Sequence, residues 1–149
     1  MSKRFEVVER SALPKTIARW ILGLFLVSAG VAHLTWARTE FLAQVPVWLP
    51  LDGDFVVVAS GLVEIALGAT LIALRRKRVL VGWIVAGFFV AIFPGNINQF
   101  VTQTDAFGLD SDVARGVRLL FQPVLVLWAL WCTDALKMLR KRASGTREE

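Results

Sequence analysis

Cysteine and histidine each occur only once in the sequence, and this scarcity limits the kinds of metal, haem and disulfide site that the chain can form. The lone Cys132 excludes an internal disulfide and a Cys-x-x-Cys redox or zinc motif. The lone His33 excludes a metal cluster of several histidines and a haem held between two histidines. The sequence also has no glycine-rich phosphate loop and no Gly-x-Ser-x-Gly elbow. We therefore expect no metal site, and no catalytic residue can be assigned from these motifs.

Charged residues are also scarce, at 19%, whereas hydrophobic residues make up 56% of the chain. Soluble domains are usually apolar in about 45–50% of positions. The excess gathers in four blocks, at about residues 17–36, 55–74, 79–100 and 117–136. Each block is about as long as an α-helix that crosses ~30 Å of hydrocarbon. Because backbone groups in lipid must be bonded within their own segment, the blocks predict an all-α membrane protein with a four-transmembrane-helix bundle.

The rest of the chain divides around these spans. We take residues 16–138 as the transmembrane domain, with an N-terminal tail over residues 1–15 and a C-terminal tail over residues 139–149. The first block also has the basic start and small-residue end of a cleaved signal peptide, but its apolar stretch is long for one. We therefore interpret it as a retained span.

The loop between the first two spans and the loop between the last two spans differ in character. Residues 37–54 carry apolar side chains at near-helical spacing, interrupted by Pro46 and Pro50, which predicts a short interfacial segment between the first two helices. Residues 101–115 are polar and acidic, which predicts a solvated loop.

The basic residues predict the orientation. All but three of the 17 lysines and arginines lie before the first span, between the second and third, or after the fourth. With four spans these segments share one side, and the positive-inside rule makes that side the cytoplasm. We expect a multi-pass protein of the plasma (inner) membrane with both termini cytoplasmic. The basic groups then serve topology and contact with acidic lipids, and no nucleic-acid partner is expected.

Glu64 is the polar residue that most needs an explanation. It lies ten residues after Asp54 and eleven before Arg75, which places it ~15 Å from either helix end, near the bilayer midplane. An acidic group there costs on the order of 2.5–3.5 kcal/mol, so it must face the interior, pair, or be protonated. Gly61 and Gly68 share its helix face, and we expect this face to form a packed seam.

Every other span also carries polar groups in the half away from the cytoplasm, whereas the cytoplasmic halves hold nothing comparable. The candidate site residues are His33, Glu64, Asn96, Arg118 and Gln122. They predict a polar intramembrane pocket open to the outer side, because buried ionisable groups in membranes mark functional sites. A structural network is the other interpretation, with Arg118 as the counter-ion of Glu64. We expect Gln99 at a solvated helix end.

Five short motifs carry a family resemblance. They are Gly23 to His33; Phe41 with Pro46, Leu49 and Pro50; Ser60 and Gly61 with Glu64 and Gly68; Phe93 to Ile97; and Arg118 to Gln122. In this order, over about residues 19–130, they resemble the DoxX family of small four-helix membrane proteins found across bacteria. The sequence departs from members of that family at Leu34, Gly95 and Leu120, where they often carry Phe, Ala and Pro.

The resemblance implies a subunit or partner of a membrane redox system, because some relatives are membrane subunits of oxidoreductases. A quinone would then be the candidate ligand of the pocket, and no covalent cofactor is implied. The alternative is a non-catalytic assembly factor or interaction protein with a structural polar core, as in animal relatives.

A transporter or channel is less favoured, because the sequence shows no inverted repeat with paired broken helices. The expected partners are the lipid bilayer and a membrane or secreted protein, and a homo-oligomer is left open.

Overall fold

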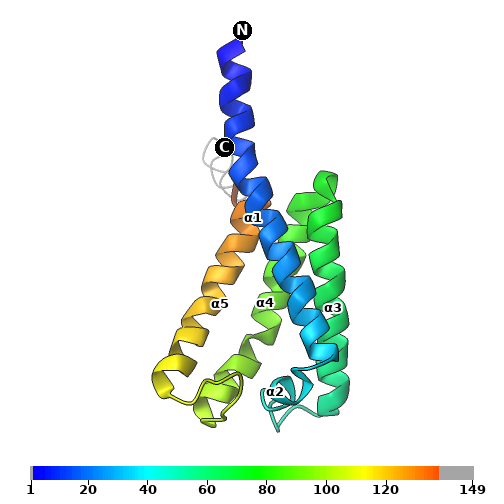
Figure 1. The fold of residues 1–149 in the computed structure, drawn as a ribbon, viewed down its shortest axis with the longest axis vertical. Helices are drawn as coiled ribbons and strands as arrows, with labels where there is room; N and C mark the ends of the chain where they lie inside the picture. The colour runs from blue at the N-terminus through cyan, green and yellow to red at the C-terminus, as the bar shows by residue number, and fades with distance from the viewer. Residues whose placement is uncertain (1, 138–149) are drawn as a thin grey trace, which may run out of the picture.

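A computed structural model describes the backbone of residues 2–137 and the side chains of residues 13–137. The predicted C-terminal tail, residues 139–149, lies outside the described residues. The elements are α1 (Ser2–Leu34), α2 (Arg38–Leu42), α3 (Gly53–Ala73), the 3-10 turn η1 (Arg75–Lys77), α4 (Arg78–Val101) and α5 (Asp112–Cys132). Figure 1 shows them as an all-helical bundle without strands in this part of the chain. Four helices are long and apolar enough to cross a membrane, which confirms the predicted fold class.

The last helix is shifted from its predicted span at both ends. We predicted a span over residues 117–136, but α5 runs from Asp112 to Cys132. It begins early because the Ser111 hydroxyl accepts a hydrogen bond from the Ala114 N–H and so caps the first turn. It ends early because Asp134 adopts a left-handed backbone with φ of 65°.

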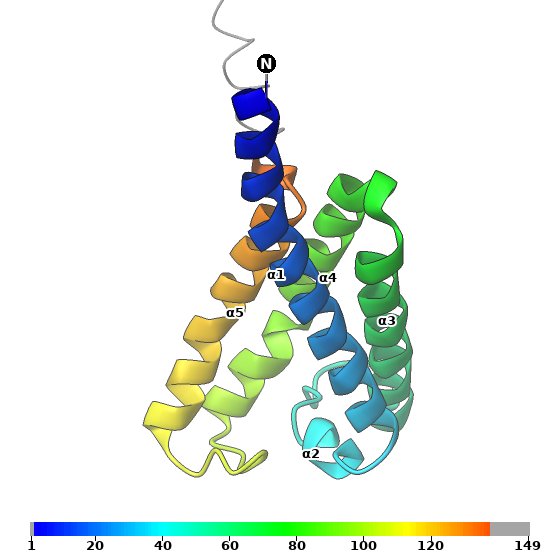
Figure 2. The same cartoon turned by 45° about the horizontal axis from the view of Figure 1, so that its top comes forward.

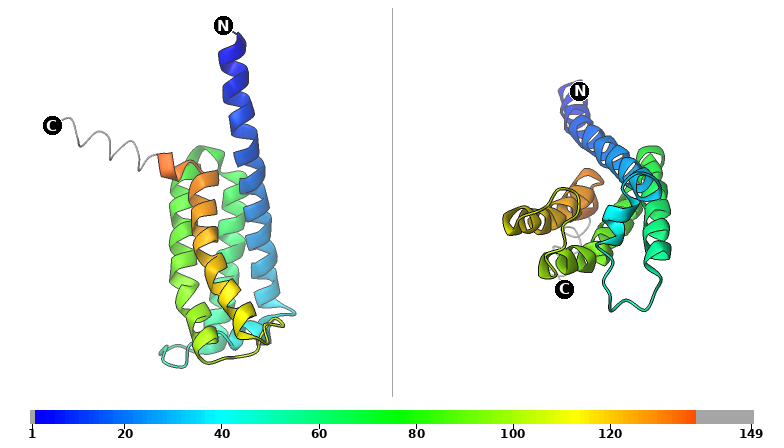
Figure 3. Two further views of the ribbon diagram at one scale, coloured as in Figure 1. Left: turned by 90° about the vertical axis from the view of Figure 1, so that its left-hand side faces the viewer. Right: turned by 60° about the horizontal axis from the view of Figure 1, so that its bottom comes forward.

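The first helix is longer than its predicted span. The predicted tail over residues 1–15 is helical from Ser2, and α1 extends past the other helices at this end (Figure 3). Its apolar part, Leu13–Leu34, is the segment long enough to span a membrane. Pro14 lies inside the helix at the start of this apolar part, where it removes one backbone N–H from the helix ladder.

The helices associate as two pairs, α1 with α3 and α4 with α5 (Figure 2). The α1–α3 pair meets through glycines, with Gly23 against Gly68 and Gly30 against Gly61. A Cβ on Gly61 would lie 2.7 Å from the Cβ of His33 and 3.0 Å from the Gly30 carbonyl oxygen. The backbones therefore approach closely only because these side chains are missing, as the shared glycine faces of the two spans predicted.

The two pairs touch each other much less than their members do. Their common core lies toward the end where α1 enters, around Leu22, Val85, Phe89 and Ala129. Figure 1 shows α5 diverging from α1 toward the opposite end, where α2 lies. Apolar packing therefore joins the two helix pairs at the end where α1 enters. At the end where α2 lies, the divergent end, α5 stands away from α1.

A short helix and its following turn occupy the segment that was predicted to be interfacial, at the divergent end. The helix α2 is followed by Pro46, which is buried, and by Val47, which is 96% exposed, and Trp48. An apolar side chain with so little protein around it is suited to the membrane surface rather than to water.

The end opposite α2 holds a charged cluster, which corrects our expectation that this half has no polar groups comparable to the candidate site. Asp134 accepts ion pairs from Lys15 of α1 at 2.6 Å, Arg78 of α4 at 3.0 Å and Lys137 at 3.1 Å. Burial acts to raise the pKa of Asp134, but the hydrogen bonds from Lys15 and Lys137 prevail and hold it below its usual range. One carboxylate thus joins α1, α4 and the segment after α5.

Arg19 belongs to the same end of the bundle. We grouped it with the basic topology signals, yet it is only 3% exposed. Its Nη1 donates to the carbonyl oxygen of Leu71 at 2.7 Å, near the last turn of α3. A guanidinium at the carbonyl end of a helix is favourable, so Arg19 ties α1 to α3.

Substituting Gly61 by Ala should destabilise the fold, because the new Cβ would meet the backbone of α1. We expect a loss on the order of 1–3 kcal/mol, seen as a lower thermal midpoint of the detergent-solubilised protein. Gly87→Ala is the matched control, since a Cβ there meets nothing within 4 Å. Equal midpoints for the two variants would contradict the glycine contact.

Substituting Asp134 by Asn should also destabilise the protein, by on the order of 1–3 kcal/mol, because three cations lose their shared counter-ion. The effect should depend on pH in a defined direction. Since the pKa of Asp134 is lowered on folding, its stabilisation is present above the unfolded pKa of about 3.9 and is lost as pH falls through the folded value. Thermal midpoints measured from about pH 6 to about pH 3 should converge for the two proteins, and a constant difference would argue against this role.

Candidate functional site

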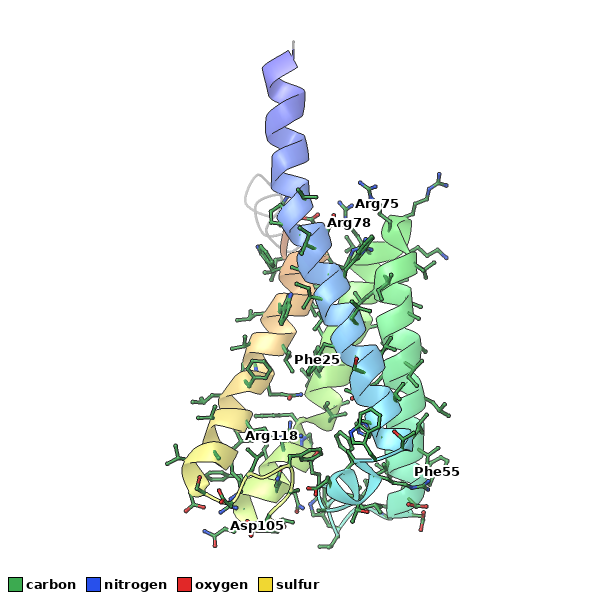
Figure 4. All side chains as sticks on the ribbon, viewed as in Figure 1. Phe25, Phe55, Arg75, Arg78, Asp105 and Arg118 are labelled. Atoms are coloured by element: carbon green, nitrogen blue, oxygen red, sulfur yellow. The ribbon has the colours of Figure 1, made fainter. Side chains whose placement is uncertain are left out.

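A cavity of about 500 Å³ lies in the divergent half of the bundle, between the two helix pairs. Its lining includes all five predicted residues: His33, Glu64, Asn96, Arg118 and Gln122. Most of the remaining lining is apolar or aromatic. Figure 4 shows Phe25 on α1 and Arg118 on α5 beside the space that separates these two helices. The structure therefore brings together the side chains that were selected from four separate spans.

His33 and Glu64 form the contact across the α1–α3 seam. The Nδ1 atom of His33 lies 2.9 Å from the Ala29 carbonyl oxygen and 3.1 Å from Oε2 of Glu64. Both neighbours are acceptors, so we infer that Nδ1 carries the proton. Glu64 is 5% exposed, and its Oε2 has no hydrogen bond of good geometry within the described residues. The imidazole ring also stacks on Phe41, with centroids 3.3 Å apart.

Asn96 and Gln122 join α4 to α5. The Asn96 amide donates to Oε1 of Gln122 at 3.0 Å, and the Gln122 amide donates to the Phe89 carbonyl oxygen at 2.6 Å. Pro94 has no backbone N–H to donate to the Val90 carbonyl in this turn of α4, and the Gln122 amide bonds the adjacent Phe89 carbonyl. Both residues are buried and satisfy each other.

Arg118 is held by neutral groups. Its Nε donates to Oδ1 of Asn96 at 3.2 Å, and its Nη2 donates to Oε1 of Gln44 at 3.1 Å. The guanidinium carbon lies 4.7 Å from the centre of the Phe107 ring, a cation–π distance. No ion pair joins Arg118 to any carboxylate in the part of the chain that the structure describes. The predicted pairing with Glu64 is therefore wrong, because that carboxylate faces His33 instead.

Gln44 and Gln99 complete the network, and neither was selected from the sequence as a site residue. Gln99, which we placed at a solvated helix end, is only 1% exposed. Its Oε1 accepts from the Gln44 amide at 2.7 Å, and its own amide donates to the Thr104 carbonyl at 3.3 Å. Gln44 lies in the turn after α2, where no periodicity indicates which way a side chain faces.

Most of the loop between α4 and α5 is exposed, as its prediction as a solvated loop implies, but its middle folds back toward the cavity. Ala106 is buried and Phe107 lines the cavity, with its ring 4.6 Å from that of Phe41. The Glu40 carboxylate accepts a hydrogen bond from the Phe107 backbone N–H. Phe107 has φ of 57°, so a backbone turn that few non-glycine residues adopt aims its ring inward.

The arrangement fits a binding site for a small molecule. Ligand pockets typically enclose ~300–1,000 Å³ and combine an apolar lining with a few polar groups that fix orientation. Here those groups are a guanidinium, side-chain amides, an imidazole and the Glu64 carboxylate, set among aliphatic and aromatic side chains. Within the described residues, no group of three His, Cys, Asp or Glu side chains could hold a metal ion.

The comparisons with known proteins overturn the resemblance to DoxX. No curated protein and no solved structure matches the chain. The family match covers residues 22–133, most of the membrane bundle, and it is to an uncharacterised family rather than to DoxX. The motifs misled because glycine seams, helix-end prolines and inward polar groups recur wherever small helices pack in lipid. The chain belongs to the family described as a domain of unknown function, DUF8561.

Proposed function

We propose that this protein binds a small lipophilic molecule with a polar head group in the cavity between its two helix pairs. The observation that carries the proposal is the guanidinium of Arg118. It lines a largely apolar cavity, and its polar and ring contacts among the described residues are with amide oxygens and an aromatic ring. A purely structural network would be expected to neutralise such a charge, because an unpaired charge in hydrocarbon is costly.

A quinone belongs to this ligand class, since its carbonyl oxygens would accept hydrogen bonds from Arg118 and Asn96. We do not extend the proposal to electron transfer, because the redox expectation rested on the resemblance to DoxX. Ligand binding alone follows from a polar cluster inside an apolar sleeve.

Filling the cavity should remove the ligand. Ala29 lines the cavity, so Ala29→Phe should occupy its centre, whereas Ser28→Phe adds the same ring on the outside of α1. We expect native mass spectrometry of protein purified in mild detergent to show a bound small molecule in the wild type and in Ser28→Phe, and little in Ala29→Phe.

Thermal midpoints of both variants serve as the control for folding. The absence of any small molecule from the wild type, with a partner protein recovered instead, would favour the alternative of a membrane assembly factor whose polar core is structural.

We also propose that the protein lies in the plasma (inner) membrane, with both termini and the turn between α3 and α4 in the cytoplasm. The support is the concentration of basic side chains at that end, including Arg75 to Arg78. The cavity would then open toward the outer leaflet.

Cysteine labelling in intact cells tests this orientation. In a Cys132→Ser background, Asp110→Cys in the loop before α5 should react with a membrane-impermeant maleimide. Lys77→Cys in the turn before α4 should react only after permeabilisation. The reverse pattern would show that the cavity opens toward the cytoplasm.

A further inference from the structure

We infer that the bound molecule is a single-chain acidic lipid, whose anionic head group binds Arg118 and whose apolar chain extends between α1 and α5. The inference rests on the proposed function and names the class of its ligand. A carboxylate and a phosphate share the chemistry that a guanidinium recognises, so either head group is included.

The first argument is the distribution of counter-ions at the divergent end. Arg115 pairs with Asp105 at 2.8 Å and with Asp112 at 2.9 Å, and Arg38 pairs with Asp54. These nearby carboxylates are therefore already engaged by the two cations outside the cavity. Arg118, the cation inside the cavity, forms no ion pair with a carboxylate among the described residues of this end.

Glu64 and Glu40, the acidic groups beside the cavity, do not pair with Arg118 either. Glu64 faces His33, and Glu40 accepts the hydrogen bond from the Phe107 N–H. An anion from outside the chain would therefore supply the charge that Arg118 lacks. Its binding would replace a costly unpaired charge by a charge-assisted hydrogen bond.

The second argument is the presentation of the guanidinium. Asn96 and Gln44 hold Nε and Nη2, and Phe107 lies against its face. Within the described residues Nη1 of Arg118 donates no hydrogen bond. This nitrogen is also not fully buried, so an incoming group can reach it. A planar group held at two nitrogens, with the third nitrogen free, is organised to donate to an incoming oxyanion.

The third argument concerns the chain of the ligand. Phe25 of α1 and Phe121 of α5 both line the cavity, yet they are 46% and 47% exposed, whereas Leu26 in the same lining is 1% exposed. The cavity lining therefore continues to the lipid-facing surface at the place where α1 and α5 have few contacts. An acyl chain can enter there from the bilayer while its head group reaches Arg118.

Binding of a fluorescent fatty acid tests the inference. The probe is cis-parinaric acid, with its methyl ester as the uncharged counterpart, titrated into protein held in phosphatidylcholine nanodiscs. We expect the acid to bind the wild type about ten-fold or more tightly than the ester. Arg118→Gln should remove that difference by weakening the acid and leaving the ester unchanged.

Two further variants make the result specific. Arg118→Lys keeps the charge but loses the planar fork, so its acid affinity should lie between those of wild type and Arg118→Gln. Arg38→Gln removes an equal charge outside the cavity and should change neither affinity. Competition by an alkyl phosphate against a fatty acid of equal chain length then identifies the preferred head group.

The outcomes separate this inference from the proposed function. If acid and ester bind equally and Arg118→Gln changes neither, while Ala29→Phe abolishes both, the cavity binds lipophilic molecules but the anionic head group is refuted. If neither probe binds the wild type and purified protein retains no small molecule, both the inference and the proposed function are refuted.

Discussion

Close backbone contact between α1 and α3 decides where the empty space of this bundle lies. Because Gly23, Gly30, Gly61 and Gly68 carry no side chains, these two helices meet along much of their length. The α4–α5 pair then packs on them mainly at the end opposite α2, around Val85 and Ala129. Little side-chain volume remains to fill the other end, and the cavity forms there. The same seam presses His33 against Glu64.

The free-energy cost of polar groups in hydrocarbon explains why most polar side chains that line the cavity contact one another. Glu64 and His33 face each other across one helix pair, and Asn96 and Gln122 bond across the other. Each of these contacts joins the two helices of one pair, although Oε2 of Glu64 makes no hydrogen bond of good geometry. Arg118 is different, because its partners are neutral amides drawn from α4 and from the turn after α2. Because Arg118 connects both halves of the bundle beside the cavity, its contacts should change when a ligand binds there.

The sequence predicted the features that follow from helix length and helix periodicity. Hydropathy identified four spanning helices, and the spacing of Gly61, Glu64 and Gly68 predicted the seam. It could not predict that Arg118 avoids Glu64, because rotation of each helix about its axis is decided by packing between helices. It also missed Gln44 and Phe107, since loop residues have no periodicity to indicate their direction. The family resemblance failed for a related reason: packing rules, rather than ancestry, repeat the same short motifs.

Arg19 and Arg118, at opposite ends of the bundle, show why access to the cavity should come from one side only. Arg19 lies at the closed end, where it binds the Leu71 carbonyl near the ion pairs of Asp134. Those bonds link α1, α3, α4 and the segment after α5, so opening that end would break several charge-assisted contacts at once. Arg118 lies at the divergent end, where only amides and the Phe107 ring hold it. A ligand that enters between α1 and α5 need displace no ion pair of Arg118, and it would bring the counter-ion that the arginine lacks.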